Sequence, residues 1–186
     1  MVAQPTSSVM TVTEYLELER HSEIKYEYID GHVYAMAGGT PDHSILGANV
    51  VAALIVALRQ SPCRVYNPNV RVRLSETRYV YVDAAVSCDE RDRGQTEEIH
   101  YPCLIVAVLS DATESKDRGD KLAYYRAGDT VQDYLLVNQH RAEIEHYHRL
   151  ADGIWTYRGY GPGEEVPIER LDIRCAVDDI YAKVDL

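Results

Sequence analysis

Apolar side chains recur at helical spacing along one long stretch in the first third of the chain. The positions, three and four residues apart, are Ile45, Leu46, Val50, Val51, Leu54, Ile55 and Leu58. This spacing is typical of an amphipathic helix, and the residues before it suit a helix start. Thr40 can cap the first free N–H groups, and Pro41 fits the first helical position. The pattern predicts a helix of about four turns that packs its apolar stripe on a sheet.

Two kinds of apolar pattern indicate the strands of that sheet. Residues 104–109 form one unbroken apolar run, as expected of a central strand that is buried on both faces. In residues 70–74, apolar side chains alternate with Arg71 and Arg73, which predicts a strand with one buried and one basic face. Residues 79–87 and 134–137 are two further strand candidates.

Two hairpins are indicated by short turns. Asp30-Gly31 is a two-residue turn that favours positive φ, and it joins residues 25–29 to residues 32–36. A second hairpin is predicted near the C-terminus, where residues 143–148 and 154–157 flank Asp152-Gly153.

Shorter helices and the ends of the chain complete the organisation. Thr11 and Glu14 form a capping-box pattern, which predicts a helix to about residue 19. A further helix is expected at residues 116–126 and should end before Gly128. Another is expected from about Val177. With 186 residues, no internal repeat and no linker, the sequence predicts a single domain. We expect a loose arm at 1–10, an α/β core at about 24–137, a polar loop at 89–98, and a C-terminal hairpin and tail at 138–186.

Charge limits the ways in which the chain could meet nucleic acid. The formal net charge is −11, so the average field repels DNA, and contact requires a local basic face or a metal ion. Residues 64–78 and 116–126 each carry a net positive charge and could meet phosphates. From these two windows we expect DNA contacts by Arg71, Arg73 and Arg118.

The remaining composition indicates a cytoplasmic protein. The four cysteines, Cys63, Cys88, Cys103 and Cys175, are widely spaced and form no C-x-x-C pair. We therefore expect reduced, buried thiols and no structural zinc site. No signal peptide is indicated, and no stretch reaches the ~18 apolar residues of a membrane span, so no membrane contact is expected.

Three polar residues stand out as candidates for chemistry. Glu27 lies in the first hairpin, Asp83 lies within the strand expected at 79–87, and Lys121 lies on the helix after the apolar run. An acid inside an apolar strand is costly unless it is paired or bound to a metal. The simpler interpretation is that Arg71 or Arg73 neutralises a buried Asp83.

The order of several segments resembles the Uma-two family of restriction-type endonucleases, within the PD-(D/E)XK nuclease superfamily. The resemblance runs from about residue 11 to residue 149. The matching segments are Tyr26-Glu27-Tyr28-Ile29-Asp30-Gly31, Ala35-Met36-Ala37-Gly38-Gly39, Cys63-Arg64-Val65-Tyr66-Asn67, Val70-Arg71-Val72-Arg73, Val82-Asp83, Ile105-Val106-Ala107-Val108-Leu109-Ser110, Asp117-Arg118-Gly119-Asp120-Lys121 and Tyr134-Leu135-Leu136-Val137.

The resemblance implies an α/β fold of the α+β kind, with a restriction-endonuclease-like core. In such a core a mixed central sheet is flanked by helices, and here it would carry added hairpins. It also implies that Glu27 and Asp83 hold Mg²⁺ or Mn²⁺, and that Glu27, Asp83 and Lys121 are catalytic. Carboxylates suit a hard divalent cation, which activates water for attack on a phosphodiester. The Lys121 ammonium would orient that water or offset charge.

The chain departs from the family pattern at the position where a second strand acid is expected. The family pattern is close to V-E-V-L-S, whereas this chain has Ala107 at the central position. Val82 replaces a proline, and Asn69 stands where many relatives carry an acid. Because catalysis needs tight geometry, we expect little or no cleavage. Asp111 is either a substitute ligand or a solvated loop acid.

Three histidines are candidate site residues, and each has two interpretations. His43, near the start of the long predicted helix, is either a substrate or metal-site residue or a helix-capping surface side chain. His146 and His148 lie two apart on a predicted strand and therefore share a face. They form either a metal pair or, with no third ligand nearby in sequence, two exposed strand residues, which we favour.

Two functions of different classes follow from these observations. The first is a Mg²⁺-dependent or Mn²⁺-dependent DNA endonuclease, with little or no activity expected because of Ala107. The second is a non-catalytic binding or assembly protein that keeps the nuclease fold, since fold alone does not decide function. A hydrolase of small phosphorylated substrates is weaker, because no phosphate-cradling glycine loop is present. By analogy with restriction nucleases we expect a homodimer.

Overall fold

A six-stranded sheet forms the centre of the fold in the computed structural model, which describes residues 9–36 and 38–186. β8 and β9 run parallel in the middle, and the other neighbours are antiparallel. All five residues of β8 are buried, as the unbroken apolar run predicts. The strands, in spatial order, are β11 (Trp155–Tyr160), β10 (Ile144–Arg149), β9 (Asp133–Val137), β8 (Leu104–Val108), β6 (Ala84–Ser87) and β3 (Arg64–Tyr66).

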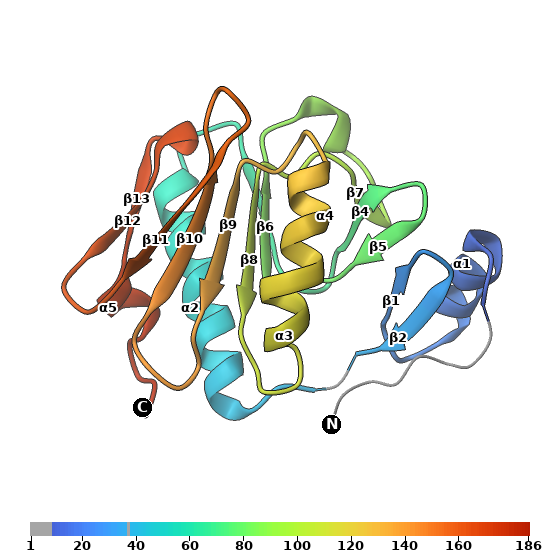
Figure 1. The fold of residues 1–186 in the computed structure, drawn as a ribbon, viewed down its shortest axis with the longest axis horizontal. Coiled ribbons are helices and arrows are strands. Elements are labelled where there is room, and N and C mark those ends of the chain that lie inside the picture. Colours follow the sequence, from blue (N-terminus) through green and yellow to red (C-terminus); the bar gives the residue numbers. More distant parts are fainter. Residues whose placement is uncertain (1–8, 37) are drawn as a thin grey trace.

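A second sheet of five strands lies beside the first (Figure 1). Its spatial order is β2 (His32–Ala35), β1 (Tyr26–Ile29), β5 (Arg78–Val80), β4 (Arg71–Ser75) and β7 (Glu98–Ile99). α1 (Val12–His21) covers this sheet, and Tyr15 of α1 packs among Tyr28, Val33 and Tyr79. The predicted capping box is present, with Thr11 and Glu14 bonded reciprocally. The predicted hairpin is present as well, with positive φ at Asp30 and Gly31.

Helices cover the two faces of the central sheet. α2 (Pro41–Leu58) covers one face together with α5 (Val177–Ile180) and the hairpin β12 (Glu165–Ile168) and β13 (Ile173–Ala176). α4 (Leu122–Ala127) covers the opposite face (Figure 1). Single 3-10 turns occur at Glu90–Asp92 and Glu169–Leu171. This mixed α/β arrangement, a sheet flanked by helices with added hairpins, matches the expected fold class.

α2 shows why a membrane span and a core helix are hard to separate by sequence. Contrary to our expectation, its 18 residues are long and apolar enough to cross a membrane by length and composition alone. In the fold, Leu46, Val50 and Leu54 are buried against the sheet. The helix therefore packs one face against the central sheet, with Thr40 as its N-cap and Pro41 in its first turn as predicted.

Several local expectations are corrected. The strand predicted at 79–87 is two strands, β5 and β6, which end and begin on either side of Asp83. The helix predicted at 116–126 consists of α3 (Glu114–Lys116), a π-helical turn (Asp117–Lys121) and α4. Most of the arm expected at 1–10 lies outside the described residues, although the Met10 N–H donates to the Gly31 carbonyl.

The expectation of four reduced thiols is also wrong. Cys63 and Cys88 form a disulfide, while Cys103 and Cys175 are buried free thiols. The pairing follows from the sheet, because Arg64 of β3 lies opposite Ser87 of β6. The residues just before β3 and just after β6 are therefore brought face to face.

Candidate functional site

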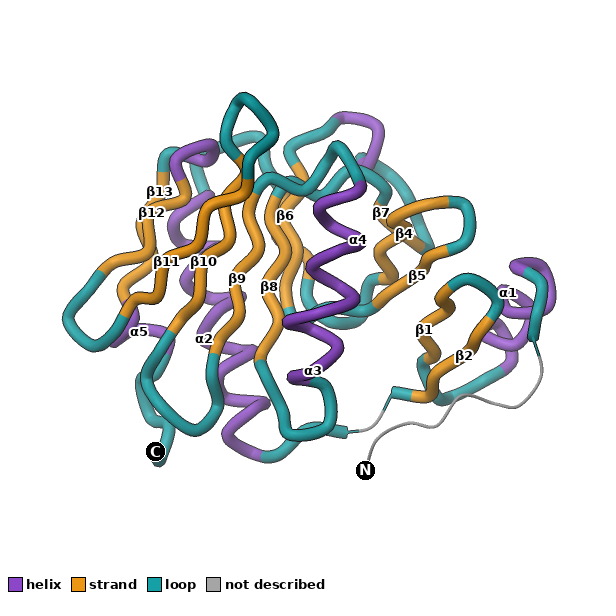
Figure 2. The backbone as a smooth tube through the Cα atoms, viewed as in Figure 1, coloured by secondary structure: helices purple, strands orange, loops and turns teal. Residues whose placement is uncertain are grey.

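A cavity of about 330 Å³ lies at the edge of the central sheet where β8 ends and α2 begins. Loops and helix ends meet along this edge (Figure 2). The cavity is lined by side chains from both sheets and from the π-helical turn. They include Glu27, His43, Asp83, Ala107, Asp117 and Lys121. The structure thus brings together the three residues singled out as catalytic candidates and the position of the missing acid.

Asp83 is fixed at the break between β5 and β6 by a backbone group of the central strand. The Val108 N–H donates to Oδ2 of Asp83 at 2.7 Å, and Nε2 of His43 lies 3.7 Å from Oδ1. Burial raises the pKa of Asp83, against the opposing influence of His43, the Val108 N–H and Lys121. The chain leaves the strand conformation here, so Asp83 presents its carboxylate to the cavity.

The simpler interpretation of Asp83, neutralisation by an arginine, does not fit these contacts. Arg71 pairs with Glu19, Glu97 and Glu98, and Arg73 lies near Glu98. Within residues 9–36 and 38–186, the only ion-pair partner of Asp83 is His43. Asp83 is therefore left available for a ligand in the cavity.

Lys121 is held between two carboxylates at the other wall of the cavity. Its Nζ lies 2.9 Å from Oε1 of Glu27 and 3.2 Å from Oδ1 of Asp117. The same Glu27 oxygen accepts the Tyr81 N–H at 3.3 Å. Burial alone lowers the pKa of Lys121, but Glu27 and Asp117 outweigh it and hold the pKa well above its usual value. Lys121 is thus a charged, positioned cation.

Ala107 occupies the place that the family pattern gives to an acid. The residue is 5% exposed and lines the same cavity as Asp83. Its neighbour Val108 supplies the N–H that binds Asp83. A carboxylate at position 107 would therefore enter the cavity next to Asp83.

Two residues of this cavity were underrated by the sequence. Asp117 was named only within a segment that matches the family pattern, yet its side chain is 3% exposed and contacts Lys121. Its spacing of four residues from Lys121 was the available signal. His43 had two open interpretations, and the structure places it in the cavity beside Asp83.

Asp111 does not take the place of the missing acid. It lines the rim of the cavity, but its side chain is 85% exposed and pairs with His140 at 2.8 Å. This placement matches a solvated loop acid.

The expected DNA contact by Arg71 is corrected by its burial. Arg71 is 6% exposed, and its guanidinium is occupied by glutamates on α1 and around β7. Arg118 is half-buried and pairs with Glu114 and Glu145. Arg73 is partly exposed, with its Nε donating to the Ser75 carbonyl. Local carboxylates therefore neutralise most of the charge of the two basic windows.

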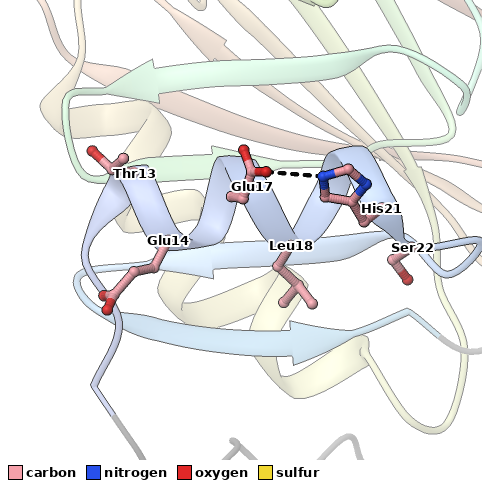
Figure 3. A pocket seen from close by; sticks show the side chains of 6 residues that line it. All are labelled: Thr13, Glu14, Glu17, Leu18, His21 and Ser22. Atoms are coloured by element: carbon pink, nitrogen blue, oxygen red, sulfur yellow. Dashed lines mark hydrogen bonds and ion pairs between the residues drawn. The ribbon is translucent and has the colours of Figure 1, made fainter.

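A second, open hollow lies on the outer surface of α1 and carries no comparable chemistry. Figure 3 shows its lining residues, with Glu17 and His21 paired at 2.8 Å on the exposed helix. Such a pair is an ordinary surface contact between residues one helical turn apart. We therefore place the candidate site at the cavity around Asp83.

The expectation that His146 and His148 are exposed is wrong. His146 is buried, and both rings contact Asp133, which lies on the preceding strand, 13 and 15 residues earlier in the sequence. The third side chain was missed because the antiparallel pairing of β9 with β10 brings it there.

Comparisons with known proteins agree with this architecture. Residues 12–178 match the Uma2 family, described as "Putative restriction endonuclease". Among similar proteins, uncharacterized protein slr1290 of Synechocystis sp. is 38% identical over 90% of this chain and 89% of its own length. Uncharacterized protein sll1609 of the same organism is 29% identical over 83% of this chain and 89% of its own length.

A solved structure confirms the fold class. It is the crystal structure of a "putative nuclease belonging to DUF820" from Anabaena variabilis, which superposes with a TM-score of 0.77 at 17% identity. The match covers 93% of this chain and 98% of that one. The resemblance noted in the sequence is thus confirmed over most of its length, and the chain belongs to the Uma2 family of restriction-endonuclease-like proteins.

Proposed function

We propose that this chain is a metal-dependent DNA endonuclease of the PD-(D/E)XK type whose site lacks one carboxylate. The observation that carries the proposal is the meeting of Asp83, Glu27 and Lys121 in one cavity. These residues come from a strand break, a hairpin and a π-helical turn that are far apart in sequence. A π-turn of this kind often marks a functional site.

The cavity suits a hard divalent cation such as Mg²⁺ or Mn²⁺. Its donors are carboxylate oxygens, which such ions prefer. The Oδ1 atom of Asp83 has only His43 as a partner among the described residues, at 3.7 Å. Asp83 and Glu27 would hold the ion. When bound, it supplies a water of lowered pKa and polarises the phosphodiester.

The residues of the chain supply position and charge. Val108 fixes the Asp83 carboxylate through its N–H. Glu27 and Asp117 keep Lys121 protonated and directed along the cavity wall. A fixed ammonium in a site sheltered from water stabilises negative charge that develops on a phosphate. Ala107 leaves the cation with fewer protein ligands, and we therefore propose low activity for the chain as it stands.

The test is cleavage of supercoiled plasmid DNA with Mg²⁺ or Mn²⁺. We expect Ala107→Glu to raise the rate of nicking by about 100-fold, the order of effect expected when site geometry is restored. Ala107→Gln is the matched control, because it adds the same volume without the charge. Adding Asp83→Ala to Ala107→Glu should abolish the gain.

Two observations favour a second candidate, a non-catalytic binding or assembly protein. The lost carboxylate at position 107 and the neutralised arginines both remove features that a nuclease uses. Absence of nicking by the wild type and by Ala107→Glu, together with no measurable Mn²⁺ binding, would support this candidate and reject the first.

The homodimer implied by the family belongs to the proposal, and light scattering in solution measures it.

A further inference from the structure

Two histidines and one aspartate converge on the face of the central sheet that α2 covers. His146 and His148 are two residues apart on β10, so their side chains point to the same face. In the register of the sheet, His148 lies opposite Asp133 of β9. Leu135 and Ile144, which share this face, belong to the core cluster that includes α2.

This cluster is separate from the cavity around Asp83. Asp133 is paired with Leu104, the first residue of β8, whereas Asp83 is bonded to Val108, the last one. Four residues of strand span roughly 13 Å. The cluster therefore lies at the opposite end of the central strands, away from the residues of the proposed nuclease site.

The three donor groups are close enough to share one ion. Oδ1 of Asp133 lies 2.7 Å from Nε2 of His146 and 2.7 Å from Nδ1 of His148. One ligand atom from each of the three side chains lies within 4.8 Å of the others. Rigid strands hold all three residues, so a bound ion would require little rearrangement.

The aspartate is incompletely satisfied where it stands. Asp133 is 1% exposed, and its Oδ1 atom accepts from both rings. Its Oδ2 atom is buried without a hydrogen-bond partner among the described residues. A buried carboxylate oxygen without a partner is costly. A cation coordinated by Oδ2, or by both oxygens of Asp133, would remove this cost, whereas the two imidazole rings contact only Oδ1.

We propose that Asp133, His146 and His148 form a site for a divalent transition-metal ion of the zinc class. Two imidazole nitrogens and one carboxylate suit Zn²⁺, Co²⁺ or Fe²⁺ and are a poor set for Mg²⁺. His148 is partly exposed, with 23% of its side chain reaching solvent. The ion would enter and exchange ligands on that side, and three protein ligands leave it at least one open position.

The test is titration of the metal-free, untagged full chain with Co²⁺ and Zn²⁺. Co²⁺ should give ligand-field absorption bands, and isothermal titration should give one Zn²⁺ per chain. His148→Asn and Asp133→Asn should each weaken Zn²⁺ binding by more than about 10-fold. His140→Asn is the matched control. His140 also pairs with an aspartate, Asp111, but the pair is exposed, and among the described residues no second histidine pairs with Asp111.

Two further measurements keep the outcome clear. The titration is repeated with Asp83→Asn, so that any ion bound beside His43 is subtracted and failure of the nuclease proposal is distinguishable. In the wild type, two of the seven histidines should change their imidazole ¹⁵N signals on addition of Zn²⁺, a readout that needs no folded variant. No saturable binding in Asp83→Asn, or equal binding by His148→Asn and His140→Asn, would overturn the proposal.

Discussion

Lys121 shows how a single charge can serve both stability and the site. It is buried with Glu27 and Asp117, so the three side chains leave one excess negative charge in the wall of the cavity. Buried charges are tolerated only when they are paired. Because folding raises the pKa of Lys121, its stabilising contribution is full at neutral pH and is lost only as pH rises through that elevated pKa.

Lys121→Met should therefore destabilise the fold strongly. The substitution keeps much of the side-chain volume and leaves two buried carboxylates uncompensated, at a cost of about 3–5 kcal/mol in the free energy of unfolding. Urea unfolding at pH 7 measures this. Glu27→Gln should cost less, since Asp117 still pairs with the lysine, and the double variant should lose less than the sum of the two. Strict additivity would show that the pair is not coupled.

Residues of the candidate site could be predicted from sequence only where order along the chain carried the information. Glu27, Asp83 and Lys121 were found through the arrangement of segments. Contacts between distant segments give no such signal. Asp133, for example, reaches His146 only through strand pairing. Arg71 was misjudged for the same reason, because alternation places it on a basic face and cannot show that glutamates of α1 and β7 bury it.

At the scale of elements, local chemistry decided the hairpin and α2, and tertiary contacts decided the rest. The turn Asp30-Gly31 and the cap at Thr40 act within a few residues, so sequence predicts them well. The break at Asp83 could not be predicted, because residues with strand propensity lie on both sides of it. The Val108 N–H, supplied by another strand, binds the side chain there. The π-helical turn likewise places Asp117 and Lys121 together in the cavity wall.

Two glycines, one in the turn of the first hairpin and one in α2, should respond to alanine with stability changes of opposite sign. Gly31 has φ of +97°, and a Cβ there would lie 2.7 Å from Cγ1 of Val9. Gly31→Ala should lower the free energy of unfolding by at least about 1 kcal/mol. Gly47→Ala in α2, where a Cβ would meet nothing within 4 Å, should raise it by about 0.5–1 kcal/mol. Urea midpoints measure both, and a neutral Gly31→Ala would contradict the strain assigned to the turn.

At the scale of the whole molecule, the acidic charge opposes the proposed substrate. The net charge is −11, and carboxylates pair with the arginines that had been expected to meet phosphates. Proteins that bind DNA through basic surfaces lose affinity as salt rises, because counterions are released from DNA. This chain lacks such a surplus of positive charge, so the association with DNA that we propose would depend on an ion bound at the cavity.

We therefore predict that a fluorescein-labelled duplex binds this protein tightly only with Mg²⁺ or Mn²⁺ and weakly without either ion. Without the ion, added monovalent salt should leave the weak binding unchanged or strengthen it slightly, since salt screens repulsion between like charges. Fluorescence anisotropy in EDTA and in Mn²⁺, at several KCl concentrations, measures both effects. Asp83→Asn should abolish the DNA binding that requires metal. Tight binding in EDTA that falls steeply with KCl would instead reveal a basic surface, and the cation at Asp83 would then not be what brings DNA to the site.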